Sequence, residues 1–495
     1  MDAENPVPRH MSPDEFRRLG RQAVDFIADY WEQVHEKPVL CPLAPGEVAG
    51  MLPEGPPACG ERWDDIFRDL SNIVVPGLTH WQSPNFYAYF PANGSFPAII
   101  ADLISTGLGV QGMLWATSPA CTELETRVLD WLVEMLGLPG AFRSTGSGGG
   151  VIHSTASEAV LTALVAARQR RRAAGVPDNG CVYASTQAHS SVIKAAMIAG
   201  IAAGPEDRAR VRLIPTDERY AMRAEELARA MRADAAAGRA PLMCVATIGT
   251  TGSTAVDAVD GVAAACAEHG AWLHVDAAFA GSALLCEEHR WMSRGVEGAD
   301  SFCFNPHKWM LTSFDCSCFW VRDRGALVES LSITPEYLRN AATQSGKVID
   351  YRDWQIPLGR RFRALKLWMV IRRYGVEGLR AYIREHVRLA MLFEQMIASD
   401  ERFEIVAPRT TSLVCFRLRA RAGETGPQTD ARNRRLMDTL NASGEMYLTH
   451  TVLPEAGVAG IPGTTRFVLR MAIGATQTRE EHVRAAFAAI SKRAE

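Results

Sequence analysis

The spacing of apolar positions predicts a helix close to the N-terminus of the chain. Ser12 and Glu15 stand at capping-box spacing around Pro13, and apolar residues recur at helical spacing up to Val34. The segment 37–57 is rich in Pro and Gly and cannot continue this helix, so we expect an extended connection there. Because only this segment joins the helix to the rest of the chain, we expect the helix to pack on a partner.

Short apolar runs alternate with helical patterns between residues 180 and 310. The runs are CVYAS, RVRLIP, LMCVATIG, WLHVDAAF and SFCFNP, and helical stretches such as AEELARAMRADAAA separate them. Strands spaced by crossover helices predict an α/β fold with a mainly parallel sheet that is buried on both faces. Ligands of such sheets bind at the carboxyl ends of the strands, so we expect the functional site there.

The pattern changes after about residue 365. A long helical stretch leads to alternating strands such as SLVCFRLR and RFVLRMAIG, and Thr478 with Glu481 predicts a capped final helix. This order of a long helix, strands and a final helix is typical of a smaller α+β domain. We therefore expect an N-terminal helical and extended segment (1–95), a large α/β domain (96–365) and a small C-terminal α+β domain (366–495).

Composition and charge narrow the class of protein. The 495 residues include 47% hydrophobic and 22% charged side chains, which is ordinary for a globular protein. The 53 basic and 56 acidic residues leave a net charge of -3, which gives no field for holding nucleic acid or an anionic membrane. The longest apolar run considered, 195–204, is too short to span a bilayer, which takes about 18 residues. We expect small-molecule chemistry, with no nucleic-acid or membrane partner.

The cysteines indicate a reducing compartment. Eleven cysteines are scattered without framework spacing, and the first residues show no secretory signal, so we expect free thiols in a cytoplasmic protein. Cys316 and Cys318 form a C-x-C pair with no second pair at zinc spacing. We interpret them as one face of a strand and expect no metal site.

A glycine cluster, GSGGGVIHSTASEA, is the first candidate for ligand binding. Val151 stands where a dinucleotide-binding loop needs its third glycine, and the Gly-Lys-Ser/Thr ending of a P-loop is absent. What remains is a loop that leads into a helix, with Thr155 and Glu158 at capping-box spacing. The N–H groups of Ala156 and Ser157 at that helix start would suit a phosphate, although most such loops are only turns.

Two charged residues follow buried apolar runs. Asp276 ends WLHVD, where a carboxylate needs a cation or caps the next segment, and the motif alone leaves both readings open. Lys308 follows SFCFNP, where it could extend its charge to solvent or, with a lowered pKa, form a Schiff base. A lysine, an aspartate and a phosphate cradle at one sheet edge are together what pyridoxal 5'-phosphate requires.

Several long motifs carry a resemblance to a known family. HWQSPNFYAYFPANGSFP, SPACTELE, TASEA, HVDAAFAG, NPHKWML and DYRDWQIPLGRRFRALKLW occur in this order. Together they resemble the aromatic-L-amino-acid decarboxylases of the pyridoxal-phosphate group II family, over nearly the whole chain. The resemblance implies the PLP-dependent transferase-like fold (fold type I) and a homodimer with active sites at the interface, in which residues 1 to 95 wrap the other subunit.

The resemblance also assigns roles around the cofactor. Lys308 would bind the aldehyde, Asp276 would pair with the ring nitrogen, and Ala278 and His189 would pack on the two ring faces. The other cofactor contacts implied are Ala156, Ser157 and Asn305 at the phosphate, Thr251 beside the ring, and His307 near the phosphate or the reacting tyrosine. The mobile catalytic loop of the family corresponds to ITPEYLRNAATQSGK and its reactive tyrosine to Tyr337. By itself, His189 could be a helix-cap or core residue, and Tyr337 an ordinary surface residue.

Fewer residues bear on the substrate. The aromatic wall of the pocket would consist of Trp81, Tyr89, Phe90 and Pro91, each of which could equally be core packing. Gln111 and Met113 stand where animal relatives carry residues contributed by the neighbouring subunit. Gly359 stands where tyrosine- and histidine-specific relatives tend to carry Ser, so it leaves room for an indole. We expect tryptophan as the favoured substrate, with 5-hydroxytryptophan, DOPA, tyrosine and phenylalanine as further candidates.

The predicted reaction is decarboxylation to an arylalkylamine and carbon dioxide. In relatives, Phe at the loop tyrosine or Asn at the stacking histidine accompanies oxidative deamination to an aldehyde, whereas Tyr337 and His189 keep the decarboxylase identity. The alternatives are an aromatic acetaldehyde synthase and a non-catalytic scaffold that binds the cofactor. An aminotransferase would require an arginine for the carboxylate of a second substrate.

Overall fold

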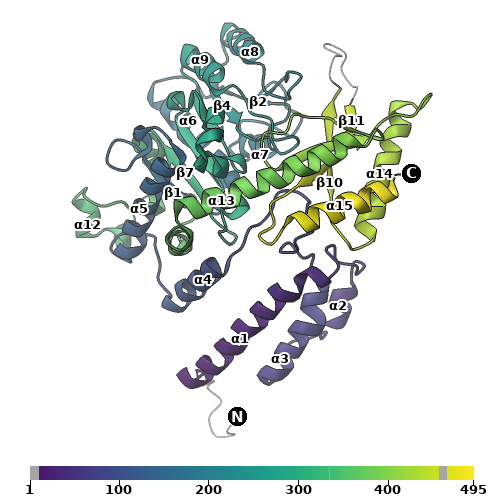
Figure 1. The fold of residues 1–495 in the computed structure, drawn as a ribbon. Helices are drawn as coiled ribbons and strands as arrows, with labels where there is room; N and C mark the ends of the chain where they lie inside the picture. The colour runs from purple at the N-terminus through teal and green to yellow at the C-terminus, as the bar shows by residue number, and fades with distance from the viewer. Residues whose placement is uncertain (1–9, 334, 456–464, 495) are drawn as a thin grey trace.

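The structure is a computed structural model that describes residues 10–333, 335–455 and 465–494, without the side chain of Tyr337. Three parts follow one another along the sequence: a helical N-terminal segment, a large sheet flanked by helices, and a smaller sheet with its own helices (Figure 1). No helix in these ranges combines the length and the apolar character needed to cross a lipid bilayer.

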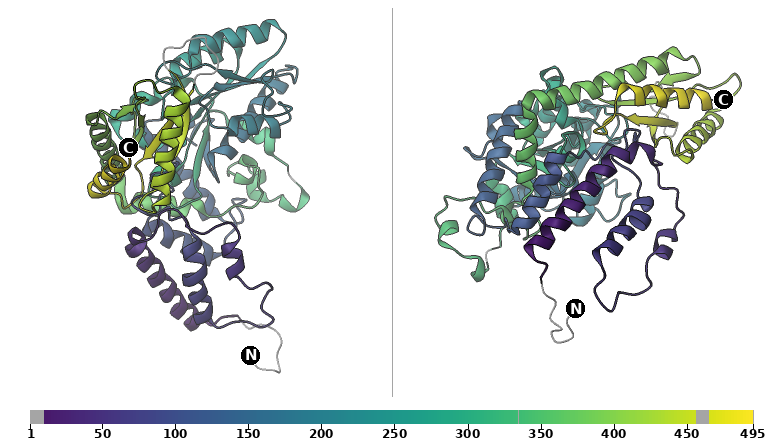
Figure 2. Two further views of the ribbon diagram at one scale, coloured as in Figure 1. Left: turned by 90° about the vertical axis from the view of Figure 1, so that its right-hand side faces the viewer. Right: turned by 60° about the horizontal axis from the view of Figure 1, so that its bottom comes forward.

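The N-terminal segment projects from the rest of the molecule (Figure 1, Figure 2). Its first helix, α1 (Pro13–Gln33), begins after Ser12, whose Oγ accepts a hydrogen bond from the N–H of Glu15 at 3.1 Å, so the predicted start is confirmed. The connection that follows is not extended throughout, because α2 (Glu47–Met51) interrupts it, and our prediction was wrong there. This short helix follows Gly46, whose φ of 95° lies in the left-handed region that glycine adopts freely.

The large sheet has seven strands among the described residues, in the order β1-β7-β6-β5-β4-β2-β3. They are β1 (Gly149–His153), β2 (Cys181–Ser185), β3 (Val211–Ile214), β4 (Pro241–Thr247), β5 (Trp272–Asp276), β6 (Ser301–Phe304) and β7 (Ser317–Val321). Only β7 runs antiparallel to its neighbours in this sheet. The mainly parallel sheet is therefore confirmed, and the five apolar runs are strands β2 to β6.

Helices cover both faces of this sheet, as expected for a buried parallel sheet. On one face α6 (Ala156–Ala173), α7 (Ser191–Ile198) and α11 (Arg324–Leu331) contribute to one hydrophobic core. On the other face lie α5 (Pro119–Leu136), α8 (Ala224–Ala236), α9 (Val259–His269) and the first part of α13 (Arg363–Ser399), which share a second core. The sheet is thus the middle of three layers.

The glycine cluster differs from its prediction, because it contains the whole of strand β1 rather than only a loop. A Cβ on Gly150 would come within 2.6 Å of Trp320 Cδ1, so glycine allows β1 to pack closely on β7. Thr155 precedes α6 as expected, but its side chain makes no capping hydrogen bond. Glu158 Oε2 instead accepts hydrogen bonds from the N–H and hydroxyl of Ser154, at 3.0 and 2.7 Å. The predicted capping box was therefore wrong, because Glu158 pairs with the residue before Thr155.

The C-terminal part contains a four-stranded antiparallel sheet in the order β10-β11-β9-β8. Its elements are β8 (Phe403–Ile405), β9 (Leu413–Leu418), α14 (Gly426–Ala442), β10 (Thr449–Pro454), β11 (Thr465–Ala472) and α15 (Glu480–Arg493). The residue before α15 is Arg479, whereas Thr478 donates its hydroxyl to Pro84 O at 2.7 Å, so the predicted cap at Thr478 was wrong by one residue. The predicted limit between 365 and 366 falls in the first turn of α13, and the domain limits stay a prediction.

The remaining elements are short or connect the parts. The helices are α3 (Trp63–Asp69), α4 (Phe96–Leu108), α10 (Pro306–Trp309) and α12 (Ala341–Gln344). Tight 3-10 turns occupy Val34–Glu36, Val75–Gly77, Gly140–Phe142, Ala280–Leu285, Glu287–Ser293, Val296–Gly298, Glu336–Leu338 and Tyr351–Trp354, and a π-helical turn occupies Leu70–Val74. The helix α13 changes direction at Gly375, whose φ of 65° and ψ of 172° are not helical.

Candidate active site

Two adjoining cavities lie at the carboxyl ends of the parallel strands. The inner cavity, of about 220 Å³, is lined by the ends of β4, β5 and β6, the start of α6 and the turn around Lys308. The outer pocket, of about 1110 Å³, is lined by residues 81 and 89–92, by 186–190 and by the C-terminal sheet. Six residues line both: Phe90, His189, Thr251, His307, Lys308 and Phe314. The site therefore lies where the parallel topology predicted it.

Asp276 is the last residue of β5 and is only 5% exposed. Its Oδ1 accepts a hydrogen bond from the N–H of Ala278 at 3.0 Å and a longer one from the Cys303 thiol at 3.8 Å. Its Oδ2 makes no hydrogen bond to any residue in the described ranges. This oxygen remains to accept a hydrogen bond from a group in the inner cavity.

Lys308 lies in α10, directly after β6, and its Nζ is 5.4 Å from the centre of the Phe90 ring. Burial lowers the pKa of Lys308 below its ordinary value of 10.5, and the nearby carboxylate of Asp276 opposes this effect only in part. The positive charge of Arg470 lowers the same pKa further. A larger share of this amine is therefore neutral and nucleophilic than in a solvent-exposed lysine.

Two histidines flank the amine. The Nδ1 of His189 accepts a hydrogen bond from the N–H of Ser191 at 3.2 Å, and desolvation lowers its pKa below 6.5. The Nδ1 of His307 accepts the N–H of Cys316 at 2.9 Å, and burial lowers the pKa of His307 to about 3. Both imidazoles are therefore neutral at pH 7, with the ring proton on Nε2.

The opposite end of the inner cavity is suited to an anion. Ala156 and Ser157 open α6, and the first N–H groups of a helix have no partner within it. Two further residues that line the inner cavity carry buried atoms, Asn305 Oδ1 and Thr247 Oγ1, that have no hydrogen-bond partner among the described residues. Unpartnered polar atoms in a buried cavity indicate a polar ligand.

These features together fit pyridoxal phosphate. The free oxygen of Asp276 suits a protonated ring nitrogen, the amine of Lys308 suits the aldehyde, and the helix start suits the phosphate. Ala278, Thr251 and Asn305 also line the inner cavity, as the resemblance implied. No group of three or more metal-binding side chains occurs in the part of the chain that the structure describes.

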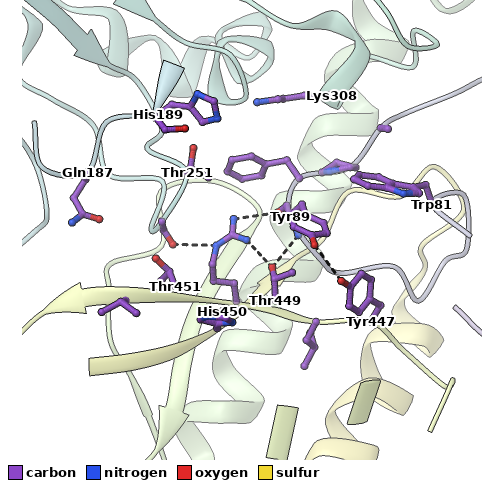
Figure 3. Close-up of a pocket in the computed structure, with 18 of the residues that line it drawn as sticks. Trp81, Tyr89, Gln187, His189, Thr251, Lys308, Tyr447, Thr449, His450 and Thr451 are labelled. Carbon is purple, nitrogen blue, oxygen red and sulfur yellow. Dashed lines mark hydrogen bonds between the residues drawn. The ribbon is translucent and has the colours of Figure 1, made fainter. Parts of the chain in front are cut away.

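The outer pocket brings together the predicted aromatic wall. Trp81, Tyr89, Phe90 and Pro91 all line it, and the rings of Trp81 and Tyr89 stack at 5.7 Å between centres (Figure 3). The aromatic wall and Lys308 therefore line the same pocket, and both come from the same chain.

Three predicted substrate residues lie outside both cavities of the single chain. Gln111 Oε1 accepts the N–H of Arg360 at 2.6 Å, and a Cβ on Gly359 would lie 3.4 Å from the Gln111 amide nitrogen. The carbonyl of Met113 accepts the N–H of Arg352 at 3.0 Å. Tyr337 belongs by its backbone to the turn Glu336–Leu338, and its side chain lies outside the described part of the structure.

The C-terminal sheet contributes residues to the outer pocket that were not predicted from the sequence. Tyr447, Thr449 and Thr451 line it, with Arg470 from the neighbouring strand β11. Because residues 447–452 all line the pocket, the alternation of a strand could not have marked them. Arg470 was hidden, because β11 is buried on both faces from Phe467 to Ala472, so the alternation that we expected for RFVLRMAIG is absent.

The fold and the inner cavity define an enzyme that depends on pyridoxal phosphate. Residues 45–419 match the family model described as the pyridoxal-dependent decarboxylase conserved domain. The chain belongs to this family of decarboxylases, its cofactor is pyridoxal phosphate, and the fold type and family that the motifs predicted are confirmed.

Individual relatives match over almost the whole chain. Tyrosine decarboxylase 1 of Narcissus pseudonarcissus is 47% identical over 492 residues, which cover 98% of this chain and 93% of that protein. Phenylacetaldehyde synthase of Arabidopsis thaliana is 46% identical over 491 residues, which cover 99% and 97%. The crystal structure of Oryza sativa TDC with PLP and tryptamine has a TM-score of 0.93 at 45% identity and covers 99% of both chains.

Proposed function

We propose that this protein decarboxylates aromatic L-amino acids, with tryptophan preferred, to the arylalkylamine and carbon dioxide. One observation carries the proposal: the inner cavity with Asp276 and Lys308 opens directly into a pocket walled by Trp81, Tyr89 and Phe90. Stacking and apolar burial on such a wall favour a substrate with an aromatic ring.

Different residues of the chain have different roles in the proposed reaction. Bound pyridoxal phosphate supplies an aldehyde and a ring that accepts electrons from the breaking carboxyl bond. Asp276 would hold the proton on the ring nitrogen, and Lys308 would bind the aldehyde in the absence of substrate. Ala278 and neutral His189 would pack on the two faces of the ring. Ala156, Ser157 and Asn305 would hold the phosphate, with Thr251 and His307 at the edges of the cavity.

The α-carbon needs a proton after carbon dioxide has left, and we assign this step to Tyr337, assisted by His189. The segment 333–347 would close over the pocket and exclude water during the reaction. Both assignments come from the family motif.

The alternative activity is an aromatic acetaldehyde synthase, which the 46% identity to the Arabidopsis phenylacetaldehyde synthase favours. His189 and Tyr337 support the decarboxylase instead. The test is to load the protein with cofactor, supply L-tryptophan, tyrosine, DOPA, 5-hydroxytryptophan and phenylalanine separately, and quantify amine, carbon dioxide, aldehyde and hydrogen peroxide. Amine equal to carbon dioxide supports the proposal. Aldehyde with stoichiometric peroxide contradicts it, and no product from any substrate would indicate a scaffold.

The preference for tryptophan rests on Gly359. Since Gly359 lies outside both cavities of its own chain, it would act on the pocket of the other subunit in the proposed dimer. Replacing it with Ser should lower the activity on tryptophan relative to tyrosine, because the added hydroxymethyl group would reduce the space for an indole there. The fold accommodates the change, since a Cβ at this position meets only the Gln111 side chain, at 3.4 Å. An unchanged ratio of kcat/KM for the two amino acids would contradict this role.

The protein is further proposed to be a homodimer in the cytoplasm. Exposed apolar residues on α1 and α4, including Phe16, Val24, Leu103 and Leu108, support a partner surface. Gln111 and Met113 would then reach the active site of the other subunit. All eleven cysteines are free in the structure, which supports a reducing compartment. Sedimentation of the active enzyme as a monomer would contradict the dimer.

A further inference from the structure

Arg470 is a buried arginine without a carboxylate partner. It lies on β11, is 3% exposed, and forms no ion pair with any acidic residue in the described ranges. A buried guanidinium is costly unless hydrogen bonds replace its water. Its Nε donates to Gly252 O at 3.2 Å, its Nη1 to Thr449 Oγ1 at 3.0 Å and its Nη2 to Tyr89 O at 3.1 Å. Arg470 thus joins three segments that are distant in the sequence.

Tyr89 is held at both of its backbone groups. Its carbonyl accepts the hydrogen bond from Arg470, and its N–H donates to Thr449 Oγ1 at 3.0 Å. Its φ of 51° lies in the left-handed region, which is unfavourable for a bulky residue and persists only where the surroundings enforce it. The two contacts close a small ring of hydrogen bonds around this strained residue.

The position of Tyr89 decides where the aromatic wall stands. Its ring stacks on Trp81, and its hydroxyl lies 3.2 Å from the hydroxyl of Tyr447, a contact that Figure 3 shows at the side of the pocket. The next residue, Phe90, has its ring centre 5.2 Å from the guanidinium of Arg470 and 5.4 Å from the Lys308 amine. Arg470 therefore touches the wall at two successive residues.

We propose that Arg470 and Thr449, both from the C-terminal sheet, are positioning residues that set the aromatic wall at Tyr89 and thereby the binding of the substrate ring. This role rests on the proposed function, because the wall is taken to receive an aromatic substrate. An aminotransferase would require an arginine for the carboxylate of a second substrate. Arg470 does not indicate such an enzyme, because three of its N–H groups already donate hydrogen bonds to the protein.

The test compares Arg470→Lys and Thr449→Val with the wild-type holoenzyme. Lysine keeps the charge but cannot make the three directed hydrogen bonds, and valine removes the shared acceptor at nearly the same size. We expect KM for L-tryptophan to rise about tenfold, the scale of one lost charge-assisted hydrogen bond, with kcat within about threefold. Tryptamine, which carries no carboxylate, should lose about the same factor in affinity by calorimetry.

A double variant separates positioning from general damage. Tyr89→Gly removes the ring and accepts the left-handed φ without strain, so little remains at this position for Arg470 to position. Adding Arg470→Lys to Tyr89→Gly should therefore change KM less than twofold. The matched control is Arg417→Lys on the adjacent strand β9, a buried arginine that pairs with Glu404 and Asp430 and lines neither cavity. This control should leave KM unchanged.

Three outcomes overturn the inference: an unchanged KM and tryptamine affinity in both single variants, additive effects in the double variant, or an equal effect of Arg417→Lys. Failure of the proposed function looks different. In that case the wild-type enzyme releases no amine, and the calorimetric comparison with tryptamine still tests the wall. If Arg470→Lys fails to fold, Thr449→Val alone and with Tyr89→Gly decides the question.

Discussion

The inner cavity and the wall of the outer pocket are built in different ways. Asp276, Asn305 and His307 in the inner cavity are at most 5% exposed and follow two adjacent parallel strands. In the wall, Trp81 and Tyr89 are 38% and 49% exposed, and side chains from the C-terminal sheet hold the backbone of Tyr89. The backbone of one sheet therefore sets the reaction chemistry, whereas contacts between distant segments set the fit of the substrate.

The largest expected effect comes from the amine of the inner cavity. Lys308→Ala should lower turnover by at least about 10⁴-fold, because no other amine lines the inner cavity to take its place. The measurements are amine release and the absorbance of the bound cofactor. A variant that keeps both would refute the assignment of Lys308.

The carboxylate of the inner cavity should come next. Asp276→Asn keeps the shape and the contact with the Ala278 N–H but removes the charge that holds the ring proton. We expect kcat to fall roughly 10² to 10³-fold, with little change in KM. Asp178→Asn, which alters only an exposed ion pair with Arg168 and Arg172, is the control. A fall confined to KM would place Asp276 in substrate binding instead.

Acid should destabilise the fold through histidines buried near the inner cavity. Burial lowers the pKa of His274 and His386 to about 4 and that of His307 to about 3, while the unfolded value is about 6.5. Below pH 6.5 the unfolded chain binds protons that the folded chain does not. The stability that these neutral histidines contribute should therefore be complete above pH 6.5. Below this pH the free energy of unfolding should fall by about 1.4 kcal/mol per pH unit for each of them, down to about pH 4.

Urea unfolding of the wild type between pH 7 and pH 4.5 measures this slope. His386 accepts the Trp309 indole N–H at 2.9 Å, so His386→Gln offers a neutral replacement that can still accept a hydrogen bond. In this variant the pH dependence of the free energy of unfolding should decrease by the contribution of one histidine, about 1.4 kcal/mol per pH unit. His450→Gln, in the outer pocket, is the comparison and should change the slope less. Equal slopes in all three proteins would disprove the account.

The smallest effect is expected at the edge of the wall. Tyr447→Phe removes the contact between the hydroxyl groups of Tyr447 and Tyr89 but leaves the ring in place. Because Arg470 and Thr449 still hold the Tyr89 backbone, KM for aromatic substrates should rise only about two- to fivefold, and kcat should not change. A larger rise than in Arg470→Lys would mean that the hydroxyl pair, rather than the backbone contacts, sets the wall.

The inner cavity was largely predictable from the sequence. Asp276 and Lys308 each follow a short apolar run, and parallel strands bring their carboxyl ends to one edge. The motifs around them predicted further cofactor contacts, and Ala156, Ser157, Asn305, Thr251, Ala278, His189 and His307 line the same cavity. The glycine cluster was misread as a loop, because the packing of Gly150 against Trp320 involves a strand far along the chain. The capping box of Thr155 and Glu158 was wrong for a local reason, because the neighbouring Ser154 donates its hydrogen bonds to Glu158 instead.

The sequence by itself determined the family, the mainly parallel sheet and the placement of a lysine and an aspartate at one edge of it, because these depend on local periodicity and on motifs. Only the tertiary structure decided how the wall is held. Arg470 and Tyr89 are 381 residues apart, and no local pattern marks Arg470 or its contact with Tyr89. Hydrogen bonds from a buried guanidinium depend on the packing of three segments in space, and no spacing along the chain encodes that packing.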